Sequence, residues 1–454
     1  MSQYISVNPW TGREIGRRDT LQFDELEERF VQTGKARERW SKMSLEQRLE
    51  RVRNLCFTLR SNVKHYALSI THEMGKRIVE AEMEIDKCAA LCEYYLDCAP
   101  EVLHEKVFAV QSAHVRLRAR PQGIVFGIMP WNFPFWQVFR LAIPNLILGN
   151  AVWIKHASSV GLTAELIEEA FIVSGFPKGL FTNVFIAPGD VEWIIADSRV
   201  RGISLTGSEQ AGRAVAALAG KHLKKTVLEL GGSNAFLLLD DASVKKAVKE
   251  AVKARLVNAG QSCIASKRFI IPKSKEKEFV DRLEETIADL RMGDPLLVTT
   301  TLAPLARIDL AKELEEQVQQ SLAQGARLKG ELARKETQFT PVILQKVKPG
   351  MIAFDQELFG PVFSITTYKT EAEAIKLVNS SRFGLGATVF GKKESEAIRI
   401  ADQLDEGSVY INSAVYSHPA IPFGGVKDSG YGREMAKEGL LEFANIQPLV
   451  KALQ

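Results

Sequence analysis

The sequence predicts an α/β protein with two doubly wound parallel-sheet domains and a small β arm. From residue 123 onward, short apolar segments alternate with helical segments, and a second set of this kind begins near residue 235. Strands separated by helices at this spacing are typical of βαβ units, which assemble into parallel sheets. The length of 454 residues suits two or three domains at about 150 residues each.

The first predicted sheet follows a helical region. Helical periodicity dominates residues 22–103, where Phe23, Leu26 and Phe30 begin the pattern. A buried loop over residues 129–134 and a buried helix over 135–148 should connect the first two strands. The strands of this sheet are expected at residues 123–128, 151–155, 182–186, 202–205 and 226–230.

The second predicted sheet has the same alternating construction. Its strands are expected at residues 235–239, 268–271, 362–368, 387–390 and 408–411. Its helices are expected at residues 244–257, 275–290 and 310–324, the last ending at Gly325. A second α/β domain follows from this pattern.

Two further segments predict the β arm. Residues 115–120 alternate apolar side chains with Arg116, Arg118 and Arg120, which suits an edge strand with one wet face, and the chain ends in an apolar run over 440–453. Protruding strand edges often pair between subunits. We therefore expect a homodimer or homotetramer.

Composition excludes several classes of protein. The chain has 59 Lys+Arg against 55 Asp+Glu, a net charge of +4 without blocks of like charge, so it shows no footprint for nucleic acid or anionic membrane. The apolar stretch 121–154 is interrupted by prolines and is not interpreted as a membrane span.

Five cysteines without paired CxxC or zinc spacing favour neither a metal site nor disulfides. Residues 1–30 lack an apolar signal segment, so we expect a cytoplasmic protein.

Two residues suggest covalent chemistry. Cys263 ends the segment Gly-Gln-Ser-Cys directly after a predicted helix; taken alone, it reads as a buried inert thiol. Glu229 closes an apolar strand and is followed by Leu230 and two glycines. Burial of a carboxylate costs free energy, so such a group is expected either to take part in the chemistry or to be paired. A helix cap or a lysine partner remains an alternative for Glu229.

Two loops suggest oxyanion and phosphate binding. Asn132 lies in Pro-Trp-Asn-Phe-Pro, whose prolines could fix its amide to donate to a developing oxyanion; the alternative is a rigid turn. Residues 207–212 read Gly-Ser-Glu-Gln-Ala-Gly after a strand and open a helix. This departs from the GxGxxG fingerprint, but a helix N-terminus after a strand suits a phosphate.

These four features, in this order and with Cys263 placed 34 residues after Glu229, resemble the NAD(P)-dependent aldehyde dehydrogenase superfamily. The resemblance runs nearly end to end, and it is closest to the succinate-semialdehyde dehydrogenases. The matching segments are residues 8–12, the Asn132 loop, Lys155, 207–212, 229–232, 260–263, 357–361 and 422–427.

The resemblance implies a domain division and a reaction. Residues 1–112 and 123–228 would form a cofactor-binding domain, 229–435 a catalytic domain, and 113–122 with 436–454 an oligomerisation arm. Cys263 would be the nucleophile, Glu229 the general base, and Asn132 an oxyanion donor together with the backbone amide of Cys263. An aldehyde would be oxidised to a carboxylic acid through a Cys263 thioester, which water activated by Glu229 hydrolyses.

The resemblance also implies a cofactor site. Lys155 and Glu357 match residues that hold the two riboses. The other expected cofactor contacts are Trp131, Ser158, Gly207, Ser208, Gly212, Leu230 and Phe359. Members that prefer NAD often carry a glutamate where this chain has Ser158. A serine there tolerates a 2′-phosphate and could bind it, so NADP is favoured over NAD.

Arg140 is the residue on which the expected substrate depends. It is the lone charge in its apolar stretch, eight residues after Asn132, and should be paired with an anion. The alternatives are a structural salt bridge, an interface contact, or the far carboxylate of a substrate, as in enzymes resembling succinate-semialdehyde dehydrogenase. Further expected substrate contacts are Trp136, Ser417 and Phe423.

Several functions remain open at this point. Some members carry a second arginine at the position of Val257, so carboxylate binding would depend mainly on Arg140. Succinic semialdehyde is the expected substrate; the alternatives are another semialdehyde or a small aliphatic or hydroxy aldehyde. A non-catalytic binding protein on the same fold is disfavoured because Cys263, Glu229 and Asn132 are all present.

Overall fold

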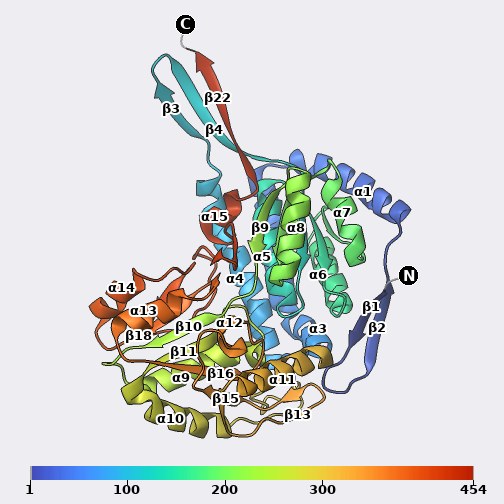
Figure 1. The fold of residues 1–454 in the computed structure, drawn as a ribbon. Coiled ribbons are helices and arrows are strands. Elements are labelled where there is room, and N and C mark those ends of the chain that lie inside the picture. The colour runs from blue at the N-terminus through green and yellow to red at the C-terminus, as the bar shows by residue number, and fades with distance from the viewer. Residues whose placement is uncertain (1–2, 453–454) are drawn as a thin grey trace.

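The structure is a computed structural model that describes residues 3–452. Figure 1 shows two α/β lobes, each built around a sheet, and a β arm that projects away from both. An N-terminal hairpin, β1 (Gln3–Val7) and β2 (Glu14–Asp19), precedes a run of helices. These helices are α1 (Phe23–Ser41), α2 (Leu45–Ser61), α3 (Val63–Met74) and α4 (Ile78–Val102).

The first sheet carries the predicted parallel strands. In spatial order it contains β21 (Gly430–Tyr431), β9 (Lys225–Glu229), β8 (Val200–Thr206), β5 (Ile124–Met129), β6 (Ala151–His156) and β7 (Phe181–Asn183). Its neighbours are parallel except at β21, which runs antiparallel to β9. The helices between these strands are α5 (Pro134–Leu148), α6 (Gly161–Val173), α7 (Val191–Ala196) and α8 (Glu209–Lys221).

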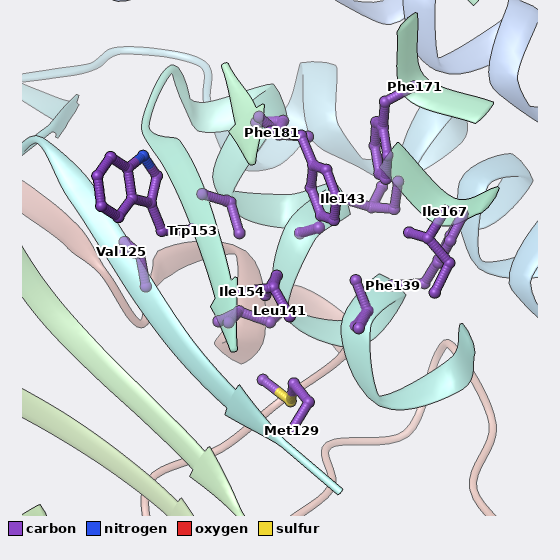
Figure 2. Packing of buried hydrophobic residues seen from close by; sticks show 14 of the residues in the cluster. Val125, Met129, Phe139, Leu141, Ile143, Trp153, Ile154, Ile167, Phe171 and Phe181 are labelled. Carbon is purple, nitrogen blue, oxygen red and sulfur yellow. The ribbon is translucent and has the colours of Figure 1, made fainter. Parts of the chain in front are cut away.

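Helix α5 is buried along its whole length, which explains the long apolar stretch in the sequence. It begins with a proline in its first turn and ends at Gly149, whose φ of 112° stops the helix. Figure 2 shows its side chain Leu141 beside Ile154 of β6, and its side chain Phe139 on the side of Ile167 of α6. The rings of Phe139 and Phe171 lie 5.5 Å apart. The burial comes from packing within the protein.

The second sheet is also doubly wound. In spatial order it contains β12 (Arg327–Lys329), β15 (Val342–Gln345), β16 (Val362–Tyr368), β11 (Ser266–Pro272), β10 (Asn234–Leu238), β18 (Ala387–Phe390) and β19 (Val409–Ile411). Among the strands of this sheet within residues 3–452, only β12 runs antiparallel to its neighbour. Its larger helices are α9 (Val244–Leu256), α10 (Glu276–Ala288), α11 (Ile308–Ala323), α13 (Glu371–Asn379) and α14 (Glu394–Ala401).

Alternate side chains of β10 separate the two faces of this sheet. Phe236 and Leu238 belong to one apolar cluster with α9 and α10, whereas Ala235 and Leu237 belong to another with α13 and α14. Because successive strand residues point to opposite faces, both faces are covered by helices. The doubly wound architecture predicted for this half of the chain is confirmed.

Short elements complete the fold. They are the hairpin β13 (Arg334–Lys335) with β14 (Gln338–Phe339), the antiparallel pair β17 (Phe383–Gly384) with β20 (Val426–Lys427), the helices α12 (Ile352–Asp355) and α15 (Ala436–Leu441), and the 3-10 turns Pro188–Asp190, Val257–Gly260 and Lys273–Lys275. Within residues 3–452, no helix is both long and apolar enough to cross a membrane. No cluster of His, Cys, Asp and Glu suited to a metal ion occurs in the same residues.

The β arm corrects one prediction. Its strands are β3 (Lys106–Val110), β4 (Ala113–Pro121) and β22 (Ala444–Ala452), and β4 pairs with both others. The interpretation of residues 115–120 as an edge strand was therefore wrong. Alternation of apolar and charged residues indicates a strand with one face exposed to solvent. It does not distinguish an edge strand from the middle strand of a single-layer sheet, which also has a solvent-exposed face. The short segment of β3 had not been recognised as a strand.

Candidate active site

A cavity of about 200 Å³ lies at the carboxyl ends of β8 and β9 and is closed by loops of the second sheet. This is the edge of a parallel sheet where ligands usually bind. The cavity brings together nine of the predicted site residues: Trp131, Asn132, Gly207, Ser208, Glu229, Leu230, Cys263, Glu357 and Phe359. Lys155, Ser158, Gly212, Arg140, Trp136, Ser417 and Phe423 lie outside its lining.

The Asn132 loop is held by buried charges on and before α4. The Lys76 ammonium donates to the Asn132 carbonyl at 2.8 Å and forms a buried ion pair with Glu84. Glu84 also accepts from the backbone amides of Phe135 and Trp136, at 2.9 and 3.0 Å. These contacts cap the N-terminus of α5, where a carboxylate is favourable. The loop is therefore fixed by more than its prolines.

The side-chain amide of Asn132 keeps a free donor. Its nitrogen donates to the carbonyl of Gln261 at 3.1 Å, which uses one of its two hydrogens. The backbone carbonyl of Asn132 accepts from the Asn258 amide at 3.0 Å. Asn132 is thus tied to the loop that precedes Cys263, and within residues 3–452 its second N–H has no hydrogen-bond partner.

The loop before Cys263 is strained. Asn258 and Ala259 have φ of 52° and 54°, and Gly260 has φ of 81°. Left-handed backbone at two successive non-glycine residues is costly and persists only where the surroundings hold it. At Gly260 a side chain would collide with the carbonyl of Gly360, so only glycine allows this approach to the loop that follows Glu357.

Cys263 sits in the cavity wall. Burial raises the pKa of its thiol to about 11, while the charges of Lys267 and Arg140 oppose this rise. The Lys267 ammonium donates to the carbonyls of Ser262 and Cys263, both at 2.8 Å, and pairs with Glu357 at 2.8 Å. Lys267 thereby fixes the backbone of the thiol loop and places a positive charge beside it.

Glu229 is a buried carboxyl group with no partner. It is 2% exposed, and neither of its oxygens has a hydrogen-bond partner within residues 3–452. The helix cap and the lysine pair considered from the sequence are both absent from that part of the chain. Burial and the neighbouring Glu434 raise its pKa well above the ordinary value. A carboxyl with a raised pKa is suited to act as a general base or acid.

Arg140 has a buried anion partner in the protein itself. The guanidinium, 2% exposed, pairs with Glu434 at 2.8 Å, and Gln137 accepts a further hydrogen bond from it. Its carbon lies 4.6 Å from the ring centre of Phe423. This arrangement favours the structural salt bridge among the alternatives considered for Arg140.

The expected cofactor contacts occupy the same edge of the first sheet. Lys155 is the last residue but one of strand β6, and Ser158 is exposed in the following turn. The Ser208 hydroxyl caps α8 by accepting from Ala211. The only hydrogen bond of the Lys155 ammonium within residues 3–452 is a long one, 3.4 Å, to the carbonyl of His156. An uncommitted cation, an exposed hydroxyl and a helix N-terminus along one sheet edge fit a dinucleotide.

Comparison with known proteins agrees with this geometry. The model of the aldehyde dehydrogenase family matches residues 2–449. The chain belongs to the aldehyde dehydrogenase family. It is 41% identical over 450 residues to the succinate semialdehyde dehydrogenase [NAD(P)+] Sad of Escherichia coli, covering 98% of this chain and 97% of that protein. It is 39% identical to the succinate-semialdehyde dehydrogenase [NADP(+)] of Deinococcus radiodurans, covering 99% and 94%.

A solved structure shows the same fold. The succinic semialdehyde dehydrogenase of Streptococcus pyogenes, in complex with NADP+, superposes with a TM-score of 0.96 at 36% identity and covers 98% of this chain and 99% of that one. The α/β class predicted from the sequence is therefore confirmed.

Some site residues of this aldehyde dehydrogenase were not found from the sequence. Lys76, Glu84, Lys267 and Glu434 hold the predicted residues in place. Lys267 lies four residues after Cys263, which could have singled it out. The others lie far along the chain from the groups that they contact, and each is a common residue type without a local motif.

Replacing Asn132 by alanine is expected to lower kcat roughly a hundredfold, because one oxyanion donor is typically worth about 3 kcal/mol of barrier. The measurement is steady-state oxidation at saturating aldehyde and cofactor. Asn62→Ala, which changes the same residue type at the exposed end of α2, is the matched control and should retain full activity. A threefold or smaller loss in Asn132→Ala would remove Asn132 from the oxyanion site.

Alkylation of Cys263 is expected to depend steeply on pH. Since its pKa is about 11 and only the thiolate reacts, inactivation by iodoacetamide should accelerate about tenfold per pH unit between about pH 7 and 9. The rate of activity loss is measured without cofactor, and the labelled peptide is identified by mass spectrometry. A rate that levels off near pH 8 would contradict the raised pKa.

Proposed function

We propose that this aldehyde dehydrogenase oxidises succinic semialdehyde to succinate, with NADP favoured over NAD as the cofactor. The observation that carries the chemistry is the convergence of Cys263, Asn132 and Glu229 on one cavity. The proposed substrate and cofactor are supported by the relatives at 41% and 39% identity, whose names give succinate semialdehyde with NAD(P)+ and NADP+.

The reaction begins at Cys263. Its thiolate adds to the aldehyde carbon and forms a thiohemiacetal oxyanion, which the free N–H of Asn132 and the backbone amide of Cys263 stabilise. Loss of hydride leaves a thioester on Cys263. Glu229 then takes a proton from water, whose oxygen attacks the thioester carbon; the tetrahedral intermediate releases the carboxylic acid and the Cys263 thiolate.

The cofactor contributes one chemical property, since a bound nicotinamide accepts the hydride. The residues proposed to hold the cofactor are Trp131, Lys155, Ser158, Gly207, Ser208, Gly212, Leu230, Glu357 and Phe359. Leu230 packs against Gly212 of α8, where any larger residue would collide with it. The first turn of α8 therefore lies close to the strand end that carries Glu229.

Substituting Ser158 by glutamate is expected to shift the preference toward NAD by roughly tenfold or more, because a carboxylate repels a 2′-phosphate. The readout is the ratio of kcat/KM for NADP to that for NAD. Ser159→Glu adds the same charge one residue further along the exposed turn and should shift the ratio less. An unchanged ratio in Ser158→Glu would show that Ser158 does not face the ribose.

Steady-state rates on succinic semialdehyde, glutaric semialdehyde and butanal, each with NADP and NAD, test the proposed function. The highest kcat/KM is expected for succinic semialdehyde with NADP. A small aliphatic aldehyde is the second candidate, because Glu434 already balances the charge of Arg140. Equal kcat/KM values for butanal and succinic semialdehyde would favour this second candidate.

We also propose that the β arm mediates homo-oligomerisation and that the domain division given above holds with two changes: Lys106–Val110 belongs to the arm, and Gly430–Tyr431 belongs to the first sheet. The arm exposes apolar side chains on β3 and β22, among them Val107, Phe108 and Val450, which are 66%, 46% and 60% exposed. Exposed apolar strands of this kind favour an interface. Light scattering should give a dimer or tetramer; a monomer would contradict this proposal.

A further inference from the structure

A second cavity, of about 500 Å³, lies behind the Asn132 loop. Phe133 and Trp136 line it from the start of α5, Lys87 lines it from α4, and Asn258 lines it from the loop before Cys263. Because Phe133 follows Asn132 directly and Asn258 donates to the Asn132 carbonyl, this cavity lies beside the predicted oxyanion site.

Lys87 is the unusual charge in this cavity. The other cations that line it have carboxylate partners: Lys76 pairs with Glu84, Arg77 with Glu80 at 3.0 Å, and Lys253 with Glu250 at 2.7 Å. Within residues 3–452, Lys87 forms no ion pair. Its ammonium instead donates to the Ser417 hydroxyl at 2.5 Å and lies 4.3 Å from the ring centre of Trp136.

The surroundings of Lys87 are rich in donors, and the two carboxylates that line the cavity, Glu80 and Glu84, are already paired with Arg77 and Lys76. Trp136 is 3% exposed, and its indole N–H has no partner in the described part of the chain. An ammonium has three hydrogens, of which the Ser417 contact uses one. Buried donors without acceptors are costly, so this arrangement is complementary to an anion. Burial, together with the charge of Arg140, lowers the pKa of Lys87 to about 8, an effect that a bound anion would oppose.

We propose that Lys87, with Ser417 and Trp136, binds the far carboxylate of a dicarboxylic semialdehyde substrate. The inference rests on the proposed function, and it assigns the preference for a dicarboxylic semialdehyde to a residue on α4. Arg140 serves this role less well because its charge is already balanced by Glu434 at 2.8 Å. The apolar walls of Phe133 and Trp136 suit the methylene groups between the two ends of the substrate.

The test is Lys87→Met, which keeps the length of the side chain and removes its charge. We expect kcat/KM for succinic semialdehyde to fall about a hundredfold, mainly through KM, and that for butanal to change by less than about threefold. Lys87→Arg should recover part of the loss. Lys249→Met is the matched control, because Lys249 is exposed on α9 and does not line this cavity; both aldehydes should be unaffected. If Lys87→Met does not fold, Lys87→Gln takes its place.

Inhibition by succinate separates this inference from the proposed function. Succinate should inhibit butanal oxidation by the wild type and inhibit Lys87→Met much less. If the wild type shows no preference for succinic semialdehyde but succinate inhibits it through Lys87, the carboxylate site stands and the substrate assignment fails. Equal losses on both aldehydes in Lys87→Met, or equal inhibition of both enzymes by succinate, would overturn the inference. A selective loss in Arg140→Gln without one in Lys87→Met would also overturn it.

Discussion

Replacing Cys263 by alanine is expected to abolish aldehyde oxidation, with a loss of at least about a thousandfold in kcat, while cofactor binding is retained. The thiol is the covalent anchor of the acyl group in the proposed reaction, and it lies in the wall of the cavity. Steady-state rates give the loss. Quenching of Trp131 fluorescence is a suitable readout of cofactor binding, because this indole lines the same cavity.

The control for this experiment is Cys98→Ala. Cys98 lies on α4, is partly exposed and does not line either cavity, so this variant should keep wild-type rates. Substantial turnover by Cys263→Ala would overturn the assignment of the nucleophile. A loss of cofactor binding together with activity would instead point to a structural role of the thiol loop.

Glu229→Gln is expected to oxidise one equivalent of aldehyde and then stall. Glutamine is nearly isosteric and cannot take a proton from water, so the thioester should accumulate after a burst of about one NADPH per site, with subsequent turnover lowered about a hundredfold or more. Stopped-flow absorbance records the burst, and mass spectrometry identifies the acylated Cys263. Added hydroxylamine, a nucleophile that needs no base, should restore turnover.

A slower burst in Glu229→Gln would indicate a different role for the Glu229 carboxyl group. If the burst slows as much as the steady state, Glu229 acts before hydride transfer, by taking the proton of Cys263. That alternative has a physical basis, since burial gives both groups raised pKa values. Equal acylation rates in wild type and variant would exclude it.

The first βαβ unit was predicted almost to the residue. The expected helix over 135–148 corresponds to Pro134–Leu148, and the expected strand over 123–128 corresponds to Ile124–Met129. Proline at the start and glycine at the end of an apolar run are local signals, which sequence reasoning reads well. The strand β21 had no such signal, because its two residues pair with β9 from a distant part of the chain.

The residues of the active site also divide into those with a local signal in the sequence and those without one. Asn132, Glu229 and Cys263 lie in short motifs whose composition is unusual for a loop or a strand end, so each could be singled out. Lys87 lies on a long amphipathic helix, where a lysine ordinarily points to solvent. Its contacts with Trp136 and with Ser417, the latter more than three hundred residues later, show that it points into the protein at a cavity instead. The partner of Arg140 was hidden for the same reason.

The strand β21 has a consequence for the synthesis of the protein on the ribosome. Glu229 and Leu228 pair with Gly430 and Tyr431, and the amide of Leu230 donates to the carbonyl of Ser429 at 3.0 Å. The edge of the first sheet therefore stays open while the chain between β9 and β21 is translated, about 10 to 40 s at 5–20 residues per second. An open strand edge invites wrong pairing, so the nascent chain needs protection during this interval. The strand end that carries Glu229 is among the last parts of the first lobe to reach its final place.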